Sequence, residues 1–126
     1  MKYSILTNFI EGESRSSNGK FLDVFNPLNG EVITQVPLSS ADVVDDAVAG
    51  AKQAFPNWAN LSLKDRAQIF FRYRHLLEKH FEELAALITE ENGKTIDEAR
   101  AEVSVSIEMA EFATSLPQIC LGEVEM

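Results

Sequence analysis

The residues whose side chains could act as nucleophiles or metal ligands are few, and their spacing does not form a catalytic set. The chain has one cysteine, Cys120, and two histidines, His75 and His80. A nucleophile needs a base and an orienting group within reach, and no motif ties Cys120 to either histidine. On one helix, His75 and His80 would point about 140° apart and would not share a metal as an i, i+4 pair does. We therefore interpret Cys120 as a small, buried, apolar residue.

Two further patterns suggest sites but have simpler explanations. Glu78, Glu82 and Glu83 could form a carboxylate cluster, yet no inward-facing Glu-x-x-His pair accompanies them, so a solvated helix face is the better interpretation. The tripeptide Gly-Lys-Thr at 93–95 is similar to the end of a phosphate-binding loop. Because the upstream glycine and a preceding strand are missing, it fits the end of one helix and the start of the next.

Composition and charge exclude several classes of protein. The 126 residues are 45% apolar and 25% charged, which is typical of a globular chain that forms one compact core. A formal net charge of -9 disfavours nucleic acid and anionic membranes as partners. The first ten residues lack the basic-then-apolar layout of a secretion signal, and a single cysteine allows no internal disulfide. These features predict a soluble, cytoplasmic protein.

The elements that would position any site begin with strands. Runs of apolar and β-branched residues at 21–25 and 32–36 flank a segment in which Pro27 favours a turn and Gly30 can adopt a positive φ. This pattern predicts a β-hairpin. A shorter strand is expected at 6–10, followed by a polar loop at 14–19.

From position 39 onward the pattern is helical. Three Ser/Thr-x-x-acid capping patterns predict three helix starts, at Ser39/Asp42, Ser62/Asp65 and Thr95/Glu98. The first helix carries the apolar stripe Val44, Ala47, Val48, Ala51 and Phe55, and is expected to end at Pro56. The second carries Phe70, Leu77, Phe81, Leu84 and Ile88 up to a C-cap at Gly93, as one helix or as two joined near His80. Trp58 and the phenylalanines are expected in the core.

The last helix has two apolar faces. One face is the stripe Ile96, Ala99, Val103, Ile107 and Ala110, and the other is Val105, Met109, Phe112 and Leu116. A helix with two apolar faces needs cover on both sides, which indicates that part of the protein is missing. Residues 121–126 end without a cap or a polar tail, which suggests truncation. The expected organisation is therefore strands at 1–38, helices at 39–116 and a tail at 117–126 that leads into missing sequence.

The order and the amino-acid sequences of several segments resemble the N-terminal region of the aldehyde dehydrogenase superfamily along nearly the whole chain. The matching stretches are Asn-Phe-Ile-Glu-Gly at 8–12, Asn-Pro at 26–27, Gly-Glu-Val-Ile at 30–33, Val-Pro at 36–37, Ala-Phe at 54–55 with Trp58, the region 66–77, Glu-Asn-Gly-Lys-Thr at 91–95, and Glu-Phe-Ala at 111–113. Within the superfamily, 87–94 looks most like the methylmalonate-semialdehyde dehydrogenase branch. Each stretch is short, but their shared order is specific.

The resemblance implies the α/β, Rossmann-type fold of that family, of which this chain would be an α+β part with an N-terminal hairpin and three or four helices. It also implies an oxidoreductase that uses NAD(P), in which a cysteine thiolate attacks an aldehyde to form a thiohemiacetal. Hydride then passes to the cofactor, and water or coenzyme A releases the acyl group. The family's catalytic cysteine, its glutamate base and the cofactor site lie beyond this chain, so the expected role here is scaffold.

Three site expectations come from the same resemblance. In some relatives a monovalent cation binds a backbone carbonyl before Asn-Pro and an acid before Asn-Gly-Lys, positions that are Phe25 and Glu91 here. The helix that flanks the substrate entrance carries Val105 and Met109. The methylmalonate branch has an arginine for the substrate carboxylate where Val105 stands, so the full-length enzyme is expected either to prefer a less acidic aldehyde or to use another cation. The alternative is that Val105 is only a packing residue and the resemblance to that branch is superficial.

The expected partners are the remainder of the same subunit and further copies in a homo-oligomer, with no nucleic acid or membrane. The alternative is a protein of another class, a stand-alone helical interaction module that binds through its two-faced last helix. The gene sequence beyond Met126 would distinguish these hypotheses. Continuation into a Gly-rich strand-turn-helix, a glutamate and then a cysteine would favour the enzyme.

Overall fold

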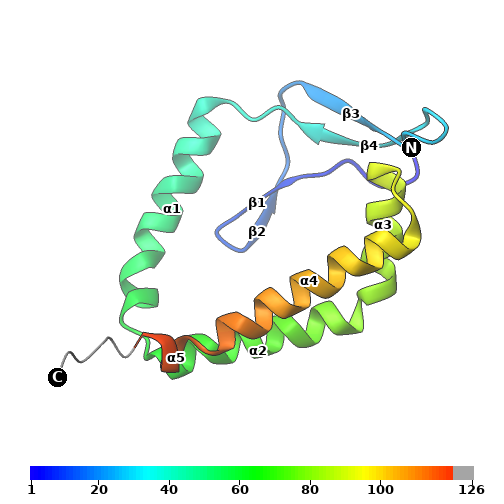
Figure 1. Cartoon of the computed structure of the whole chain (residues 1–126). Helices are drawn as coiled ribbons and strands as arrows, with labels where there is room; N and C mark the ends of the chain where they lie inside the picture. Colours follow the sequence, from blue (N-terminus) through cyan, green and yellow to red (C-terminus); the bar gives the residue numbers. More distant parts are fainter. Residues whose placement is uncertain (121–126) are drawn as a thin grey trace. The chain divides into compact units, whose positions relative to one another are not determined.

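Four short strands precede five helices in residues 1–120, the part of the chain that the computed structural model describes (Figure 1). The strands are β1 (Asn8–Ile10), β2 (Glu13–Arg15), β3 (Phe21–Phe25) and β4 (Val32–Pro37). The helices are α1 (Ala41–Ala59), α2 (Leu63–Lys79), α3 (Phe81–Asn92), α4 (Ile96–Thr114) and the short α5 (Leu116–Ile119). This arrangement confirms the α+β prediction of strands followed by helices.

The chain divides into two compact units, where the sequence predicted a single core. The first unit contains Met1–Ala59 together with Glu90–Gly93. The second contains Asn60–Thr89 and the described residues from Lys94 onward. Helix α3 therefore begins in the second unit and ends in the first.

The first unit has two antiparallel hairpins. Strands β3 and β4 pair from Phe21↔Pro37 to Phe25↔Val32, which confirms the predicted hairpin. Strand β1 pairs with β2, which the sequence had assigned to a polar loop. The reason is the turn between them: Glu11 at φ 55° and Gly12 at φ 81° adopt the two consecutive left-handed conformations that a two-residue hairpin turn requires.

The N-terminal segment lies along β4 through backbone hydrogen bonds. The amide of Tyr3 donates to the carbonyl of Ile33 at 2.9 Å, and that of Leu6 donates to Gln35 at 2.9 Å. Between them, the hydroxyl of the buried Thr34 donates to the carbonyl of Ser4 at 2.7 Å. The hydroxyl of Thr34 therefore has a hydrogen-bond partner, as a buried polar group requires.

Helix α1 departs from the sequence prediction in three ways. It continues through Pro56 to Ala59, because proline's fixed φ is compatible with a helix that forgoes one hydrogen bond. No residue of α1 is buried, so Phe55 and Trp58 are not core residues. The expected capping box is also wrong, because the hydroxyl of Ser39 accepts a hydrogen bond from the side-chain amide of Asn8 at 2.9 Å instead.

The second unit begins with two helices where the sequence left open one or two. Helix α2 ends at Lys79, and α3 begins at Phe81 after a single residue, His80. The predicted cap of α2 is confirmed, since the hydroxyl of Ser62 accepts the amide of Asp65 at 3.1 Å. Figure 1 shows α2 and α4 side by side, and small buried residues, Ala67 on α2 and Ala110 on α4, let the two helices approach closely.

Helix α4 supplies the core of the second unit. Its capping box is complete: Thr95 accepts the amide of Glu98, whose carboxylate accepts the amide of Thr95 at 2.9 Å. Ala99 and Val103 are buried with Ala85 of α3. The partly buried residues packed on this cluster are Phe81, Leu84, Ile88, Ile96 and Ile107. The first predicted stripe of α4, which contains Ala99, Val103 and Ile107, therefore packs inward. Within residues 1–120, no helix has the length and hydropathy needed to cross a membrane.

Candidate functional site

Two turns of the first unit meet where the sequence placed a cation site. In the first turn, the backbone amide of Asn26 donates to Glu31 at 2.8 Å, and the side chain of Asn26 accepts the amide of Leu28 at 2.9 Å. The second turn is the end of α3, where Gly93 has φ 82°. A Cβ on Gly93 would lie 2.8 Å from Cγ of Pro27. Glycine is therefore required here both by its φ and by this close approach, and it also provides the predicted C-cap.

The two residues expected to hold the cation flank these turns. Phe25 is the last residue of β3, beside an irregularity of the β3–β4 pairing between Val24 and Phe25. Glu91 lies in the last turn of α3 and is exposed. Among the ion pairs of residues 1–120, none involves Glu91. Both residues belong to the first unit, and cation binding itself stays a prediction.

The neighbouring acid, Glu90, is held by the N-terminus. Nζ of Lys2 donates to Glu90 at 2.9 Å and the hydroxyl of Tyr3 donates at 2.7 Å. These hydrogen bonds favour the charged carboxylate, so they lower the pKa of Glu90, with Lys2 the larger cause. The same bonds raise the pKa of Lys2. The sequence had no signal for this cluster, because its members are separated by nearly 90 positions.

The second face of α4 is exposed, as predicted. Val105 is 52% exposed, Met109 60% and Phe112 65%, while Leu116 is half-buried. The nearby acids are exposed and largely paired. Arg100 contacts Glu82 at 2.9 Å, Arg74 contacts Glu78 at 3.1 Å, and His80 contacts Glu83 at 2.7 Å. These contacts agree with a solvated face at Glu78, Glu82 and Glu83.

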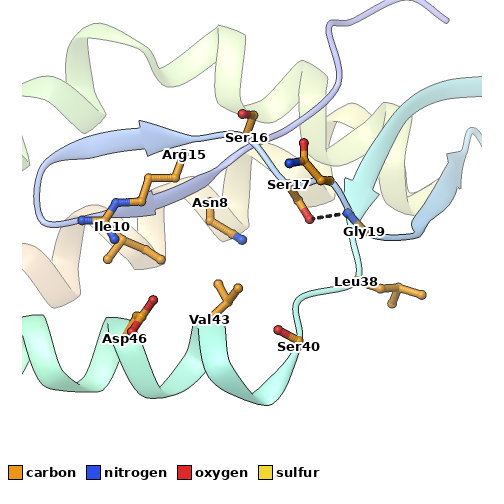
Figure 2. Close-up of a pocket in the computed structure, with 11 residues that line it drawn as sticks. Asn8, Ile10, Arg15, Ser16, Ser17, Gly19, Leu38, Ser40, Val43 and Asp46 are labelled. Carbon is orange, nitrogen blue, oxygen red and sulfur yellow. Dashed lines mark hydrogen bonds between the residues drawn. The ribbon is translucent and has the colours of Figure 1, made fainter.

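A cavity of about 320 Å³ lies between the β1–β2 hairpin, the following loop and the start of α1 (Figure 2). Figure 2 shows Arg15 on the hairpin side and Asp46 on α1 among its lining residues. Arg15 also forms an ion pair with Glu11, so its charge is already compensated. The lining has the hydroxyls of Ser16, Ser17 and Ser40 but no histidine that could activate them, so the cavity offers polar surface without a catalytic set. This cavity could not be predicted, because no pattern in the sequence links the 14–19 segment to α1.

Cys120 is exposed, so its assignment as a buried apolar residue is wrong. It follows α5, and its backbone amide donates to the carbonyl of Leu116 at 3.0 Å. Neither histidine is hydrogen-bonded to it in the described part of the chain. Residues 1–120 also contain no Gly-rich strand-to-helix turn of the kind that binds dinucleotide phosphates.

Comparisons with known proteins match this chain along almost its whole length. The model of the aldehyde dehydrogenase family matches residues 14–125. The malonate-semialdehyde dehydrogenase of Lacticaseibacillus casei is 45% identical over 119 residues, which are 94% of this chain and 24% of that protein. The chain thus spans about a quarter of the length of the relatives it matches.

Solved structures agree with the sequence comparison. One is a Sinorhizobium meliloti protein that is described as a methylmalonate-semialdehyde dehydrogenase and was solved with NAD. It is 35% identical to this chain, with a TM-score of 0.91, and the match covers 100% of this chain and 26% of that one. The methylmalonate-semialdehyde dehydrogenase of Oceanimonas doudoroffii is 36% identical, also with a TM-score of 0.91, over 96% of this chain and 25% of that one.

Proposed function

The chain belongs to the aldehyde dehydrogenase family, and we propose that it forms the N-terminal scaffold of an NAD(P)-dependent semialdehyde dehydrogenase. The main support for this proposal is a structural match to a protein described as a methylmalonate-semialdehyde dehydrogenase. That match covers the whole of this chain with a TM-score of 0.91. A stand-alone interaction module is not favoured, because the match extends over strands and helices alike.

In this proposal the chemistry is carried out by the rest of the subunit. When bound there, NAD(P) accepts a hydride from the thiohemiacetal carbon. The residues of this chain neither hold the cofactor nor supply the nucleophile. Their contribution is structural, through the turn contact at Pro27 and Gly93 and the packed α2–α4 pair. The proposed location is the cytoplasm, and the proposed assembly is a homo-oligomer.

A chimera tests the scaffold role. This chain replaces the quarter of the L. casei malonate-semialdehyde dehydrogenase that it matches. The expected result is a folded oligomer that reduces NAD+ with malonate semialdehyde, while the isolated chain reduces none with any aldehyde. A folded chimera without activity would contradict the proposal, and so would turnover by the isolated chain that disappears in Cys120→Ser.

We further propose that Val105 weakens selection for an acid-bearing aldehyde. Val105 is exposed on the second face of α4, next to Met109 one turn later. A valine offers apolar contact only, whereas an arginine binds a carboxylate through two parallel hydrogen bonds. The relatives named for malonate semialdehyde indicate an acidic substrate class, so a cation from the rest of the subunit would have to compensate for Val105 if that class applies here.

The specificity proposal is tested in the same chimera. The measurement is the ratio of kcat/KM for malonate semialdehyde to that for propanal, with and without Val105→Arg. We expect Val105→Arg to raise the ratio about tenfold. If the unmodified chimera already strongly favours the acid and Val105→Arg adds nothing, the proposal fails.

A monovalent cation bound by the Phe25 carbonyl and Glu91 is a separate proposal. Its support is the contact between the two turns that carry these residues, together with a carboxylate that has no ion-pair partner within residues 1–120. The test is thermal unfolding of the isolated chain in KCl, NaCl and choline chloride. The expected result is a higher Tm in one alkali salt that Glu91→Gln abolishes, with Glu108→Gln, at an exposed acid that has no ion pair within residues 1–120, as the control. Equal Tm values in all three salts would show that Phe25 and Glu91 do not bind a monovalent cation.

A further inference from the structure

The dipeptide Asn-Gly occurs at three places in the chain, 18–19, 29–30 and 92–93. In such a pair the backbone nitrogen of the glycine can attack Cγ of the asparagine side chain. Glycine favours this attack, because it has no Cβ to obstruct the nitrogen and it adopts most backbone conformations. The three places share the reactive dipeptide, so their different surroundings in the structure determine which of them reacts.

Asn18 has the freedom that ring closure requires. It lies between β2 and β3, outside any strand or helix, and both Asn18 and Gly19 are exposed. Within residues 1–120, the side chain of Asn18 makes no hydrogen bond. The amide of Gly19 donates to the hydroxyl of Ser17 at 3.1 Å (Figure 2). This is a neutral hydrogen bond to a nearby side chain in an exposed loop, so it is a weak restraint on the nitrogen.

Asn29 is held by its turn at both reacting groups. Its side-chain amide donates to the carboxylate of Glu31 at 3.0 Å, and its side-chain oxygen accepts the amide of Glu31 at 3.0 Å. The amide of Gly30, which carries the attacking nitrogen, donates to the carbonyl of Asn26 at 2.8 Å. The nitrogen of Gly30 therefore reaches Cγ of Asn29 only when the turn opens.

Asn92 is held by the helix that it ends and by the packing of the next residue. It is the last residue of α3, so rotation of its backbone away from the helical conformation is opposed. Gly93 has φ 82°, and a Cβ on it would lie 2.8 Å from Cγ of Pro27. The packed Gly93 cannot follow a rotation of Asn92 without separation of these two turns.

We propose that Asn18 is a site of spontaneous deamidation in the folded chain, an inference that does not depend on the proposed function. The nitrogen of Gly19 forms a bond to Cγ of Asn18, and the bond from Cγ to Nδ2 breaks. The amide proton of Gly19 is transferred through water, and Nδ2 leaves as ammonia. Water then opens the cyclic imide at either carbonyl, which gives aspartate or isoaspartate. No atom changes its oxidation state.

The reaction changes both the charge and the backbone of the loop after β2. Asn18 lines the cavity to which Arg15 and Asp46 also belong, so a carboxylate at position 18 adds a negative charge to its wall. The isoaspartate form also adds one atom to the main chain between β2 and β3. The cavity wall of a stored sample therefore becomes a mixture of chemical forms.

Peptide mass mapping of the full chain tests the proposal. Trypsin cleaves after Arg15, Lys20, Lys52, Lys79 and Lys94, so the three dipeptides lie in the separate peptides 16–20, 21–52 and 80–94. One sample is kept folded at neutral pH and another is unfolded in urea. In the folded sample, we expect Asn18 to convert at least about tenfold faster than Asn29 and Asn92, because only these two require local opening. In urea the three rates should become similar.

Three variants identify the reacting groups. Asn18→Gln requires a larger ring, and Gly19→Ala adds a Cβ beside the attacking nitrogen, so both should suppress conversion at position 18. The matched control Asn29→Gln should leave conversion of Asn18 unchanged. Peptide 16–20 should yield both the aspartate and the isoaspartate form. Aspartate alone would mean direct hydrolysis without attack by Gly19, which overturns the proposal. So would conversion of Asn29 or Asn92 as fast as that of Asn18 in the folded chain, or conversion of Asn18 only in urea.

Discussion

Helices α1 and α4 are both 19 residues long and amphipathic, yet only α4 is packed. Helix α4 buries Ala99, Val103 and Ala110, and α1 buries nothing. Helix α4 also has a complete capping box, whereas α1 has no side-chain cap at Ser39. The comparison shows that an apolar stripe marks the side of a helix that is suited to burial. Whether that side is buried depends on which other segments of the protein are present.

The largest expected effect would come from a charge on the packed face of α4. Val103→Asp buries a carboxylate in the cluster with Ala85 and Ala99, so it should lower the free energy of unfolding by about 4 kcal/mol. Val48→Asp on α1 should change it by about 0.5 kcal/mol or less. Urea unfolding of the two variants measures both values, and similar losses would refute the contrast between the helices.

An intermediate effect is expected at the helix starts. Thr95→Ala removes the hydroxyl that accepts the amide of Glu98 at 3.3 Å, and should destabilise the chain by about 1 kcal/mol. The control is Ser39→Ala, whose hydroxyl bonds Asn8 and does not cap α1. Urea unfolding that showed the larger loss in Ser39→Ala would mean that α1 depends on its start more than α4 does.

These differences also explain what the sequence could and could not predict. The hairpin at β3–β4, the caps at Ser62 and Thr95 and the C-cap at Gly93 depend on neighbouring residues, and they were predicted correctly. The α4 stripe was also correct, because its partners in α3 are close in the sequence.

The errors concern features that depend on distant or missing partners. Phe55 and Trp58 were expected in the core from their residue type, but type alone does not provide a covering surface. Cys120 was assigned as buried for the same reason and is exposed. Strand β2 was missed because Glu13, Ser14 and Arg15 carry no apolar alternation, and its pairing depends on the turn at Gly12.

A smaller effect is expected on the second face of α4, which resembles the apolar stripe of α1 in its exposure. Met109 is 60% exposed, so Met109→Glu should change the free energy of unfolding by about 0.5 kcal/mol or less. The substitution should instead reduce self-association of the isolated chain and its binding of a hydrophobic dye. Light scattering and dye fluorescence measure the two effects. A monodisperse wild-type chain that binds no dye would contradict the prediction.

The smallest effect is expected at Glu90, where α3 meets the N-terminus rather than another helix. The pKa of Glu90 lies below its ordinary value of 4.5, because Lys2 and Tyr3 donate hydrogen bonds to the carboxylate. Its stabilising contribution is therefore present above the pKa of the unfolded chain and is lost as pH falls through the lower folded-state pKa. The Tm of wild type should fall slightly more than that of Glu90→Gln between pH 7 and about pH 3. Parallel Tm profiles would show that the hydrogen bonds contribute nothing.

Hydrogen exchange of the backbone amides distinguishes the packed helix α4 from the uncovered helix α1. In the isolated chain, we expect slow exchange around Ala99 and Val103 and fast exchange along the stripe from Val44 to Phe55. In the chimera with the L. casei enzyme, both helices should exchange slowly, because in the proposed scaffold role the rest of the subunit packs on this chain. Slow exchange of α1 already in the isolated chain, or fast exchange of α1 in an active chimera, would contradict the account.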